Sequence, residues 1–364
     1  MRNIGFCIDS LEMGGAEKLL VDIIELLYTT GRYNIFLLTK TKSDSYFYNK
    51  IKDKVNYFYL ISKEDEEKYK KYSFVGKFLT SIIKKKNFKK FSSNVEILID
   101  FLDGDFCKYI KLEKQKEKII WLHLNYERLV KEKKLKEKIK YYSKIIVTTE
   151  EMYNRIKKEE MKSMCNKKIY MIYNFIDFKK IDNMLLEKNI EKLEEENYFL
   201  TVCRLDEKQK DVSTLIKAFS LYKGDEKLYI IGDGESRTEL EKLAKELKIF
   251  EKIRFLGIQN NPYIYMANSK AFILSSKAEG FGLVVAEALY CGTKVIASDC
   301  DYGPREILLN GEIGELFKVG DEKYLLEKLN NINNYNYSKE KIRISLRRFD
   351  KKEILRKMEK IFND

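Results

Sequence analysis

Two carboxylates stand eight residues apart beside a glycine turn. The stretch Ser275–Gly292, SSKAEGFGLVVAEALYCG, follows an apolar run at 270–274 that predicts a buried parallel strand, and from Leu283 it predicts an apolar helix. A strand, a glycine turn and a helix N-terminus favour an anion site, because free backbone N–H groups and the helix dipole point the same way. Glu279 and Glu287 would repel a phosphate there, so we expect them to accept hydrogen bonds from sugar hydroxyls.

A basic loop follows a second predicted strand. The run 198–203 is apolar, and the loop after it begins with Arg204 and also contains Lys208 and Lys210. An arginine fork can bind two oxygens of a diphosphate, and a lysine adds a point charge. We therefore predict a diphosphate site, with an ordinary solvated basic loop as the alternative for this segment by itself.

The first half of the chain offers two glycines and one histidine. Gly14 and Gly15 follow a predicted strand at 3–9 and open a helix, where they would allow a ligand close to the backbone. His123, the only histidine, ends a predicted strand at 118–122, at the edge where open α/β sheets bind ligands. A structural or exposed histidine is the alternative.

The sequence offers little for a metal or a redox cofactor. Asp103 and Asp105 follow a predicted strand and could hold a divalent metal, but we favour a surface turn, since a helix terminus already serves the anion. The six cysteines lack paired spacing, which argues against a disulfide framework or a zinc site and fits a reducing cytoplasm. No turn completes G-x-G-x-x-G, which disfavours a dinucleotide oxidoreductase. We predict no cofactor and no metal.

Strands and helices alternate in both halves of the 364 residues, which predicts an α/β protein with two Rossmann-like domains facing a cleft. The predicted domains are 1–177 for the acceptor, 178–345 for the nucleotide and 346–364 as a C-terminal helix packing toward the first domain. No apolar run is long enough to span a bilayer, and the first strand begins too early to follow a signal peptide. We expect a cytoplasmic protein.

The net charge of +13 is the sum of +14 over residues 1–180 and −1 over residues 181–364, and the excess comes mostly from lysine clusters at 84–90 and 131–140. A solvated lysine face is the simplest interpretation. Attraction to an anionic membrane surface is the alternative that we pursue, which would make the protein peripheral on the inner face of the cytoplasmic membrane. No nucleic-acid motif is present, so nucleic acid ranks below lipid. Aromatic residues flank the clusters and support an interfacial position: Phe88, Phe91, Tyr141 and Tyr142.

A series of motifs in the chain resembles those of the retaining glycosyltransferases of family 4, which have the GT-B fold. The resemblance is dense over 198–320 and sparser before it. The spacing of Glu279 and Glu287 is the most specific of these motifs. The matching segments are Gly14–Lys18, Asn174–Asp177, Arg204–Lys210, Gly232–Gly234, Phe255–Gly257, Glu279–Ala288, Gly292–Ala297 and Gly303–Glu306.

The resemblance implies a role for each site residue. Glu287 would accept from the ribose hydroxyls, Glu279 would contact the donor sugar, and His123 would position that sugar. Arg204 and a lysine would neutralise the diphosphate; Lys208 and Lys210 compete, and we choose Lys210 because the following helix then aligns. The remaining residues implied in nucleotide-sugar binding are Gly14, Gly15, Gly232, Gly257, Gly280, Phe281, Gly282 and Leu283.

The activity implied is retaining transfer of a hexose or N-acetylhexosamine from a UDP-sugar to a saccharide or lipid-linked saccharide, for a cell-surface polysaccharide. No enzymic nucleophile stands beside the site, so we expect same-face attack in which the departing phosphate takes the acceptor proton. The alternatives are a non-catalytic scaffold on the same fold and a sugar-nucleotide epimerase.

Overall fold

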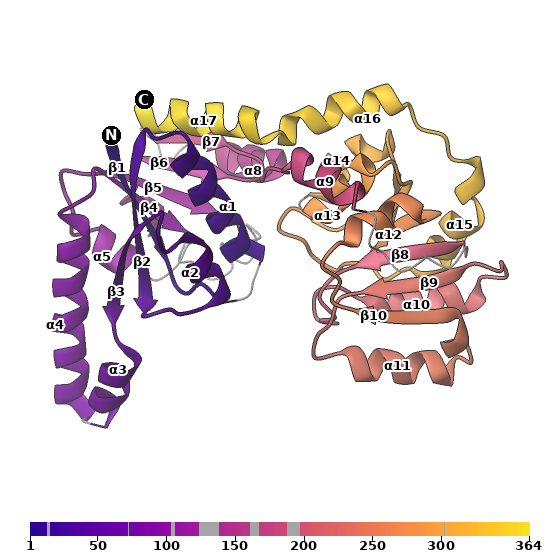
Figure 1. Cartoon of the computed structure of the whole chain (residues 1–364), viewed down its shortest axis with the longest axis horizontal. Coiled ribbons are helices and arrows are strands. Elements are labelled where there is room, and N and C mark those ends of the chain that lie inside the picture. The colour runs from indigo at the N-terminus through magenta and orange to yellow at the C-terminus, as the bar shows by residue number, and fades with distance from the viewer. Residues whose placement is uncertain are drawn as a thin grey trace. The chain divides into compact units, whose positions relative to one another are not determined.

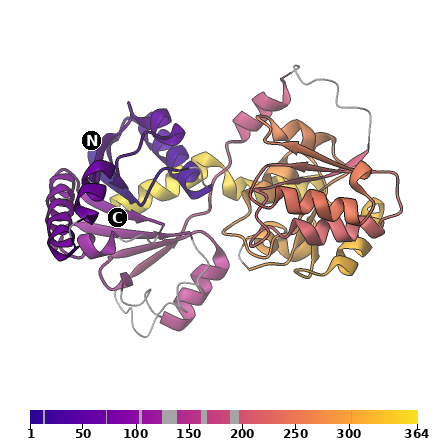
Figure 2. The same ribbon diagram turned by 90° about the horizontal axis from the view of Figure 1, so that it is seen from below.

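The computed structural model describes residues 1–12, 15–71, 73–102, 106–123, 138–160, 167–187, 197–301 and 303–364. The chain divides into two compact units (Figure 1). The N-terminal unit comprises residues 1–173 and 354–364, and the C-terminal unit comprises residues 174–353. Each unit has its own parallel sheet with helices on both faces, as the two ribbon views show (Figures 1 and 2).

The N-terminal unit is built on a seven-stranded parallel sheet in the order β3-β2-β1-β4-β5-β6-β7. Its central strands are apolar on both faces because helices cover both; every residue of β4 is buried. The strands are β1 (Arg2–Ile8), β2 (Tyr33–Thr41), β3 (Asn56–Ile61), β4 (Ile97–Phe101), β5 (Glu117–Leu122), β6 (Lys144–Val147) and β7 (Lys168–Met171).

The helices of this unit follow the strands as βαβ crossovers require. They are α1 (Gly15–Thr29), α2 (Tyr46–Ile51), α3 (Lys63–Lys70), α4 (Ser73–Ser92), α5 (Cys107–Ile110) and α8 (Glu150–Glu160). Helix α4 packs on the sheet through Phe88 and Phe91, which are 2% and 0% exposed. Tyr142 is also buried, so the expectation that these three aromatic residues face an interface is wrong: they are core residues.

The C-terminal unit has a six-stranded parallel sheet in the order β10-β9-β8-β11-β12-β13. Its strands are β8 (Tyr198–Val202), β9 (Lys227–Ile231), β10 (Ile253–Gly257), β11 (Ala271–Leu274), β12 (Val295–Ser298) and β13 (Glu315–Phe317). The chain runs outward from β8 to β10 and then returns to the other side of β8 as β11. The carboxyl ends of β8 and β11 therefore form the switch point at which such sheets bind ligands.

The helices of this unit surround that sheet. They are α9 (Phe178–Leu185), α10 (Val212–Leu221), α11 (Arg237–Glu246), α12 (Pro262–Asn268), α13 (Leu283–Tyr290), α14 (Pro304–Ile307), α15 (Glu322–Asn330) and α16 (Lys339–Leu346). The C-terminal helix predicted over 346–364 begins later than expected, because a short 3-10 turn, Arg347–Phe349, precedes it. The last helix, α17 (Lys351–Asn363), follows this turn.

Most of α17 belongs to the N-terminal unit, which fits the predicted return of the chain's last helix. The Nζ atom of Lys144 donates to the carbonyl of Ile361 at 2.6 Å, and Lys168 forms an ion pair with Asp364 at 2.8 Å. The ring of Phe362 packs edge-on against Tyr33. The predicted α/β class with two Rossmann-like domains is confirmed by these two sheets.

Candidate active site

The loop after β8 is held in a fixed shape by its own polar groups. The backbone N–H of Lys210 donates to the carbonyl of Asp206 at 2.7 Å, and Asp211, which immediately precedes α10, has a left-handed φ of 50°. Thr214 donates from its hydroxyl to Asp211 at 2.9 Å, and Lys277 reaches the same carboxylate at 3.3 Å. This loop therefore presents Lys210 from a rigid support.

The loop after β11 meets that first loop at the switch point. The Nζ atom of Lys210 lies 2.6 Å from Oε1 of Glu279, and the Ser276 hydroxyl donates to the same oxygen at 2.6 Å. The two loops are also joined through the backbone, where the N–H of Lys277 donates to the carbonyl of Gln209 at 2.7 Å. Glu279 is 7% exposed. A buried carboxylate bound by one cation and one hydroxyl is thereby fixed in orientation at the carboxyl ends of two adjacent strands.

The two competing lysines have different surroundings. Lys208 is 86% exposed at its side chain and lies 3.2 Å from the exposed Glu235. The Lys210 side chain is only 16% exposed. The structure thus brings Lys210, and not Lys208, onto Glu279. Arg204 is 60% exposed and contacts Asp206 at 3.0 Å, so its guanidinium remains accessible to a ligand.

Glycines shape the site where backbone segments approach closely. Gly232 has a φ of +126°, and a Cβ atom there would lie 1.8 Å from the carbonyl oxygen of Cys203. The N–H of Gly232 donates to the carbonyl of Gly257 at 2.8 Å, which links the ends of β9 and β10. A Cβ atom at Gly234 would lie 2.3 Å from the carbonyl oxygen of Leu205. Larger residues would displace the basic loop.

Helix α13 begins at the same edge. Gly282 takes the position before its first residue with a φ of +78°, and Gly280, Phe281 and Leu283 stand on either side of it. Phe281 is buried, and its ring packs edge-on against that of Phe349. One turn into the helix, Glu287 accepts from the Tyr263 hydroxyl at 3.2 Å. The predicted glycine turn, helix N-terminus and two carboxylates therefore lie in one region.

The candidates in the N-terminal unit are described separately. Gly14 lies outside the described residues, as do Asp103 and Asp105, while Gly15 is the exposed first residue of α1 with open space around its Cα. His123 directly follows β5 and is 9% exposed, with its ring 4.3 Å from that of Phe101. Burial lowers the pKa of His123 to about 3, so the imidazole is neutral at pH 7. Its Nε2 atom has no hydrogen-bond partner within the described part of the chain.

Sequence reasoning missed two residues of the site. Ser276 holds Glu279, and Tyr263 holds Glu287. A serine pair directly after an apolar strand could have indicated the first of these. Nothing in the sequence around Tyr263 indicates the second, because it lies on α12 and reaches Glu287 only through packing. In the described ranges, no group of three or more metal-ligating side chains is assembled.

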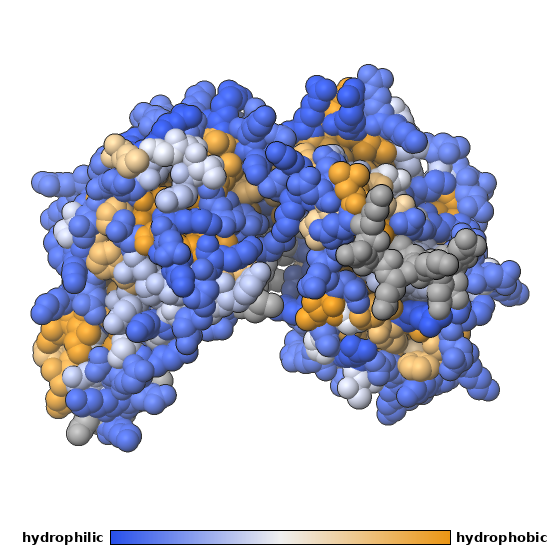
Figure 3. Space-filling view, in the orientation of Figure 1, coloured by the Kyte–Doolittle hydropathy of each residue, from blue (hydrophilic) through white to orange (hydrophobic). Residues whose placement is uncertain are grey.

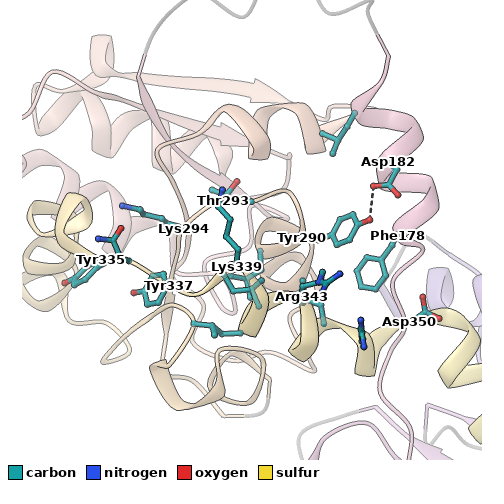
Figure 4. Close-up of a pocket in the computed structure, with 18 residues that line it drawn as sticks. Phe178, Asp182, Tyr290, Thr293, Lys294, Tyr335, Tyr337, Lys339, Arg343 and Asp350 are labelled. Atoms are coloured by element: carbon teal, nitrogen blue, oxygen red, sulfur yellow. Dashed lines mark hydrogen bonds between the residues drawn. The ribbon is translucent and has the colours of Figure 1, made fainter.

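A cavity of about 730 Å³ lies elsewhere in the C-terminal unit (Figure 4). Phe178 of α9 stacks on Tyr290 at 4.3 Å, and Tyr290 donates to Asp182 at 2.8 Å. Lys339 and Arg343 of α16 stand along its rim, and Lys294 precedes β12. This cavity lies by the amino end of β12 and contains none of the predicted site residues, whereas open α/β sheets bind substrates at the carboxyl ends of their strands.

Comparison with known proteins bears on both units. The family model of glycosyl transferases group 1 matches residues 183–349. A Campylobacter jejuni relative, N-acetylgalactosamine-N,N'-diacetylbacillosaminyl-diphospho-undecaprenol 4-alpha-N-acetylgalactosaminyltransferase, is 29% identical over 90% of this chain and 89% of its own length. A Salmonella typhimurium lipopolysaccharide 1,6-galactosyltransferase is 35% identical over 34% of this chain and 35% of its own.

Solved structures share the fold over the whole chain. The lipopolysaccharide outer core galactosyltransferase WaaB, in its apo form, superposes with a TM-score of 0.76 at 22% identity, covering 100% of this chain and 99% of WaaB. Anabaena HepE in complex with UDP superposes with a TM-score of 0.77 at 18% identity, covering 100% of both chains. The family match contains Lys210, Glu279 and Glu287, and the relatives are named glycosyltransferases, so the chain is a glycosyltransferase whose residues 183–349 match the glycosyl transferases group 1 family.

Proposed function

We propose that the chain is a retaining enzyme of family 4, transferring a hexose or N-acetylhexosamine from a nucleotide diphosphate sugar, most simply a UDP-sugar. The observation that carries this proposal is the Lys210–Glu279 pair, 2.6 Å apart, at the switch point beside α13. A cation for the leaving diphosphate and a carboxylate for the sugar hydroxyls stand side by side there. The complexes of Anabaena HepE with UDP and with UDP-glucose support the choice of UDP.

Each residue has a proposed part in the reaction. Arg204 is exposed and can bind two diphosphate oxygens, while Lys210 neutralises a third. The backbone N–H groups that follow Gly280 donate to the sugar or β-phosphate at the start of α13. Glu287 accepts from the ribose, in the position where it now accepts from Tyr263. Binding of the leaving group in this manner favours bond cleavage, because these cations bind more strongly as negative charge develops on the diphosphate.

We propose same-face attack for the transfer itself. The acceptor hydroxyl approaches the anomeric carbon on the side of the departing phosphate, and the phosphate oxygen takes the hydroxyl proton. The new glycosidic bond then keeps the configuration of the donor. The alpha linkage in the name of the Campylobacter relative supports this proposal, because an α-configured donor gives it by retention. His123, neutral and buried, is proposed to position the donor sugar and not to transfer a proton.

The proposed acceptor is a saccharide linked to a lipid diphosphate or to lipopolysaccharide. The relatives support this class, since their names specify a diphospho-undecaprenol saccharide and lipopolysaccharide. Such an acceptor lies at a membrane surface, so we propose peripheral attachment there, on the cytoplasmic side, as part of cell-surface polysaccharide synthesis. Arg204 and Lys210 supply the positive charge that a divalent metal would otherwise supply, so we also propose turnover without added metal.

Thermal unfolding in the presence of UDP, GDP or ADP, each with Mg²⁺ or with EDTA, tests the donor site. We expect UDP, but not GDP or ADP, to stabilise the protein, and to do so equally in Mg²⁺ and in EDTA. At a UDP concentration one hundred times Kd, the free energy of unfolding should rise by about 2.7 kcal/mol. Glu287→Ala should weaken this stabilisation. Turnover of a water-soluble, short-chain lipid-diphosphate saccharide, with the anomer of the product assigned by NMR, then tests retention. No stabilisation by any nucleotide, or an inverted product, would contradict the proposal.

A further inference from the structure

Helix α4 has an exposed apolar face over its first half. Val75, Phe78, Leu79 and Ile82 are 63%, 60%, 39% and 47% exposed. Their spacing of three and four residues places them on one side of the helix. Figure 3 shows a hydrophobic patch at the position of this helix, at the lower left. Contiguous exposed apolar patches mark interaction sites, so this face is a candidate surface for a partner.

The same face becomes basic toward the end of the helix. Lys86 and Lys89 follow Ile82 at the same helical spacing, and Lys85 and Lys90 flank them. Lys89 forms an ion pair with Glu113 at 3.2 Å. Lys85 and Lys90 are exposed, and their ammonium groups meet no carboxylate of the residues that the structure describes. One helix face therefore carries an apolar half followed by a cationic half.

The opposite face of α4 is fixed by the fold. Phe91 is fully buried and packs against Phe58 at 5.7 Å, and Asn87 donates to the carbonyl of Leu60 at 2.9 Å. Lys84, on this side, is paired with Glu66 of α3 at 2.8 Å. Because these contacts set the rotation of the helix, the apolar stripe is held outward and cannot turn into the core.

We propose that α4 is an interfacial helix that docks the protein on an anionic lipid bilayer. In this arrangement Phe78, Leu79 and Ile82 enter the boundary between headgroups and acyl chains, and the lysines contact lipid phosphates. Charge favours lipid over a protein partner, because lysines are depleted from protein interfaces but enriched on the polar side of interfacial helices. Among the described residues no helix is both long and apolar enough to cross a bilayer, so α4 would lie on the membrane.

The biological reason for this docking rests on the proposed function, since a lipid-linked acceptor lies at a membrane. The binding itself requires neither donor nor acceptor. Failure of the two proposals can therefore be distinguished: nucleotide stabilisation and turnover of the water-soluble acceptor test the first, and vesicle binding without substrates tests the second.

Co-sedimentation with vesicles of phosphatidylglycerol and phosphatidylcholine measures the binding. The double variant Phe78→Asp with Ile82→Asp should bind the vesicles at least about tenfold more weakly, because two apolar side chains no longer enter the bilayer. The matched control is Leu221→Asp with Ile344→Asp, two side chains of the C-terminal unit that are 51% and 53% exposed. The control should bind as the wild type does. Both variants should keep turnover of the water-soluble acceptor.

Depth of insertion is measured by quenching with brominated lipids. Trp121, the only tryptophan, is 1% exposed and should not be quenched. The second indole introduced by Phe78→Trp should be quenched on vesicle binding. Lys85→Gln with Lys90→Gln should reduce binding at low salt and make it less sensitive to salt. The proposal would be overturned if the wild type failed to sediment with the vesicles, or if Phe78→Asp with Ile82→Asp bound them as well as the wild type does. It would also be overturned if that double variant lost a protein dimer instead of lipid binding.

Discussion

Lys210 and Glu279 are 69 residues apart in the chain and meet with 2.6 Å between Nζ and Oε1. Their side chains are 16% and 7% exposed, and Ser276 donates to the same carboxylate oxygen. The pair joins the loop after β8 to the loop after β11. An interaction in this position combines two functions, since it stabilises the loops and also orients the charges that a diphosphate sugar would contact.

Separating the two functions requires a double-mutant cycle. Lys210→Met and Glu279→Gln should each lower the free energy of unfolding by about 2 kcal/mol, because each leaves a partly buried charge without its partner. The double variant should be destabilised by less than the sum of the two. Turnover should fall at least a hundredfold in all three variants. A double variant that recovers activity along with stability would show that the pair is structural only.

Arg204 and Lys208 provide a matched comparison within one loop. Both side chains are exposed, at 60% and 86%, so replacing either with alanine should change the free energy of unfolding by less than about 0.5 kcal/mol. Arg204→Ala should reduce kcat by a factor of about 100 to 1,000, and Lys208→Ala should leave it nearly unchanged. The reverse pattern in steady-state kinetics would assign the diphosphate to Lys208.

Gly232 should tolerate no side chain. Gly232→Ala places a Cβ atom on the carbonyl oxygen of Cys203, at a φ of +126°. We expect a loss of at least about 3 kcal/mol and of UDP stabilisation in thermal unfolding. Gly311→Ala is the control, because its φ is +97° but nothing lies within 4 Å of the added atom. The control should cost about 1 kcal/mol and keep nucleotide binding; equal losses would mean that backbone strain alone is responsible.

His123 should make the N-terminal unit sensitive to acid. Its pKa is about 3 in the folded protein, against 6.5 ordinarily, so the unfolded chain binds the proton first as the pH falls. Stability from the neutral imidazole is therefore complete above pH 6.5 and is lost between pH 6.5 and 3. Urea unfolding followed by Trp121 fluorescence should show wild type losing about 1 kcal/mol per pH unit more than His123→Phe in this range. Parallel curves for the two proteins would exclude the effect.

Sequence reasoning identified the architecture because β-strands buried on both faces are continuous apolar runs. The runs at β4, β5, β8 and β11 are recognisable by this property, and each is followed by a polar or glycine-rich loop. Since parallel strands end at one edge of a sheet, the loops with Arg204 and Glu279 could be expected at a common edge. The strand order that makes β8 and β11 neighbours is consistent with this expectation.

The sequence favoured Lys210 over Lys208 through the alignment of the following helix, but it could not predict where either ammonium group lies. The left-handed backbone at Asp211 and the hydrogen bond from Lys210 to Asp206 set where each lysine points. The prediction that Phe88 and Phe91 of α4 face an interface was wrong for a similar reason. A rotation of 100° per residue decides whether Phe88 or Phe78 faces the sheet, and that rotation follows from contacts with β3, not from local sequence.

The return of residues 354–364 to the N-terminal unit affects the order in which the protein can fold during synthesis. The ribosome completes residues 174–353, and with them the whole C-terminal unit, before it supplies the backbone carbonyl of Ile361 that Lys144 binds. The unit translated first is thus the last to be completed. Until residues 354–364 leave the exit tunnel, the amino ends of β2, β6 and β7 lack these contacts, and a nascent chain stalled before residue 354 would expose them to chaperones.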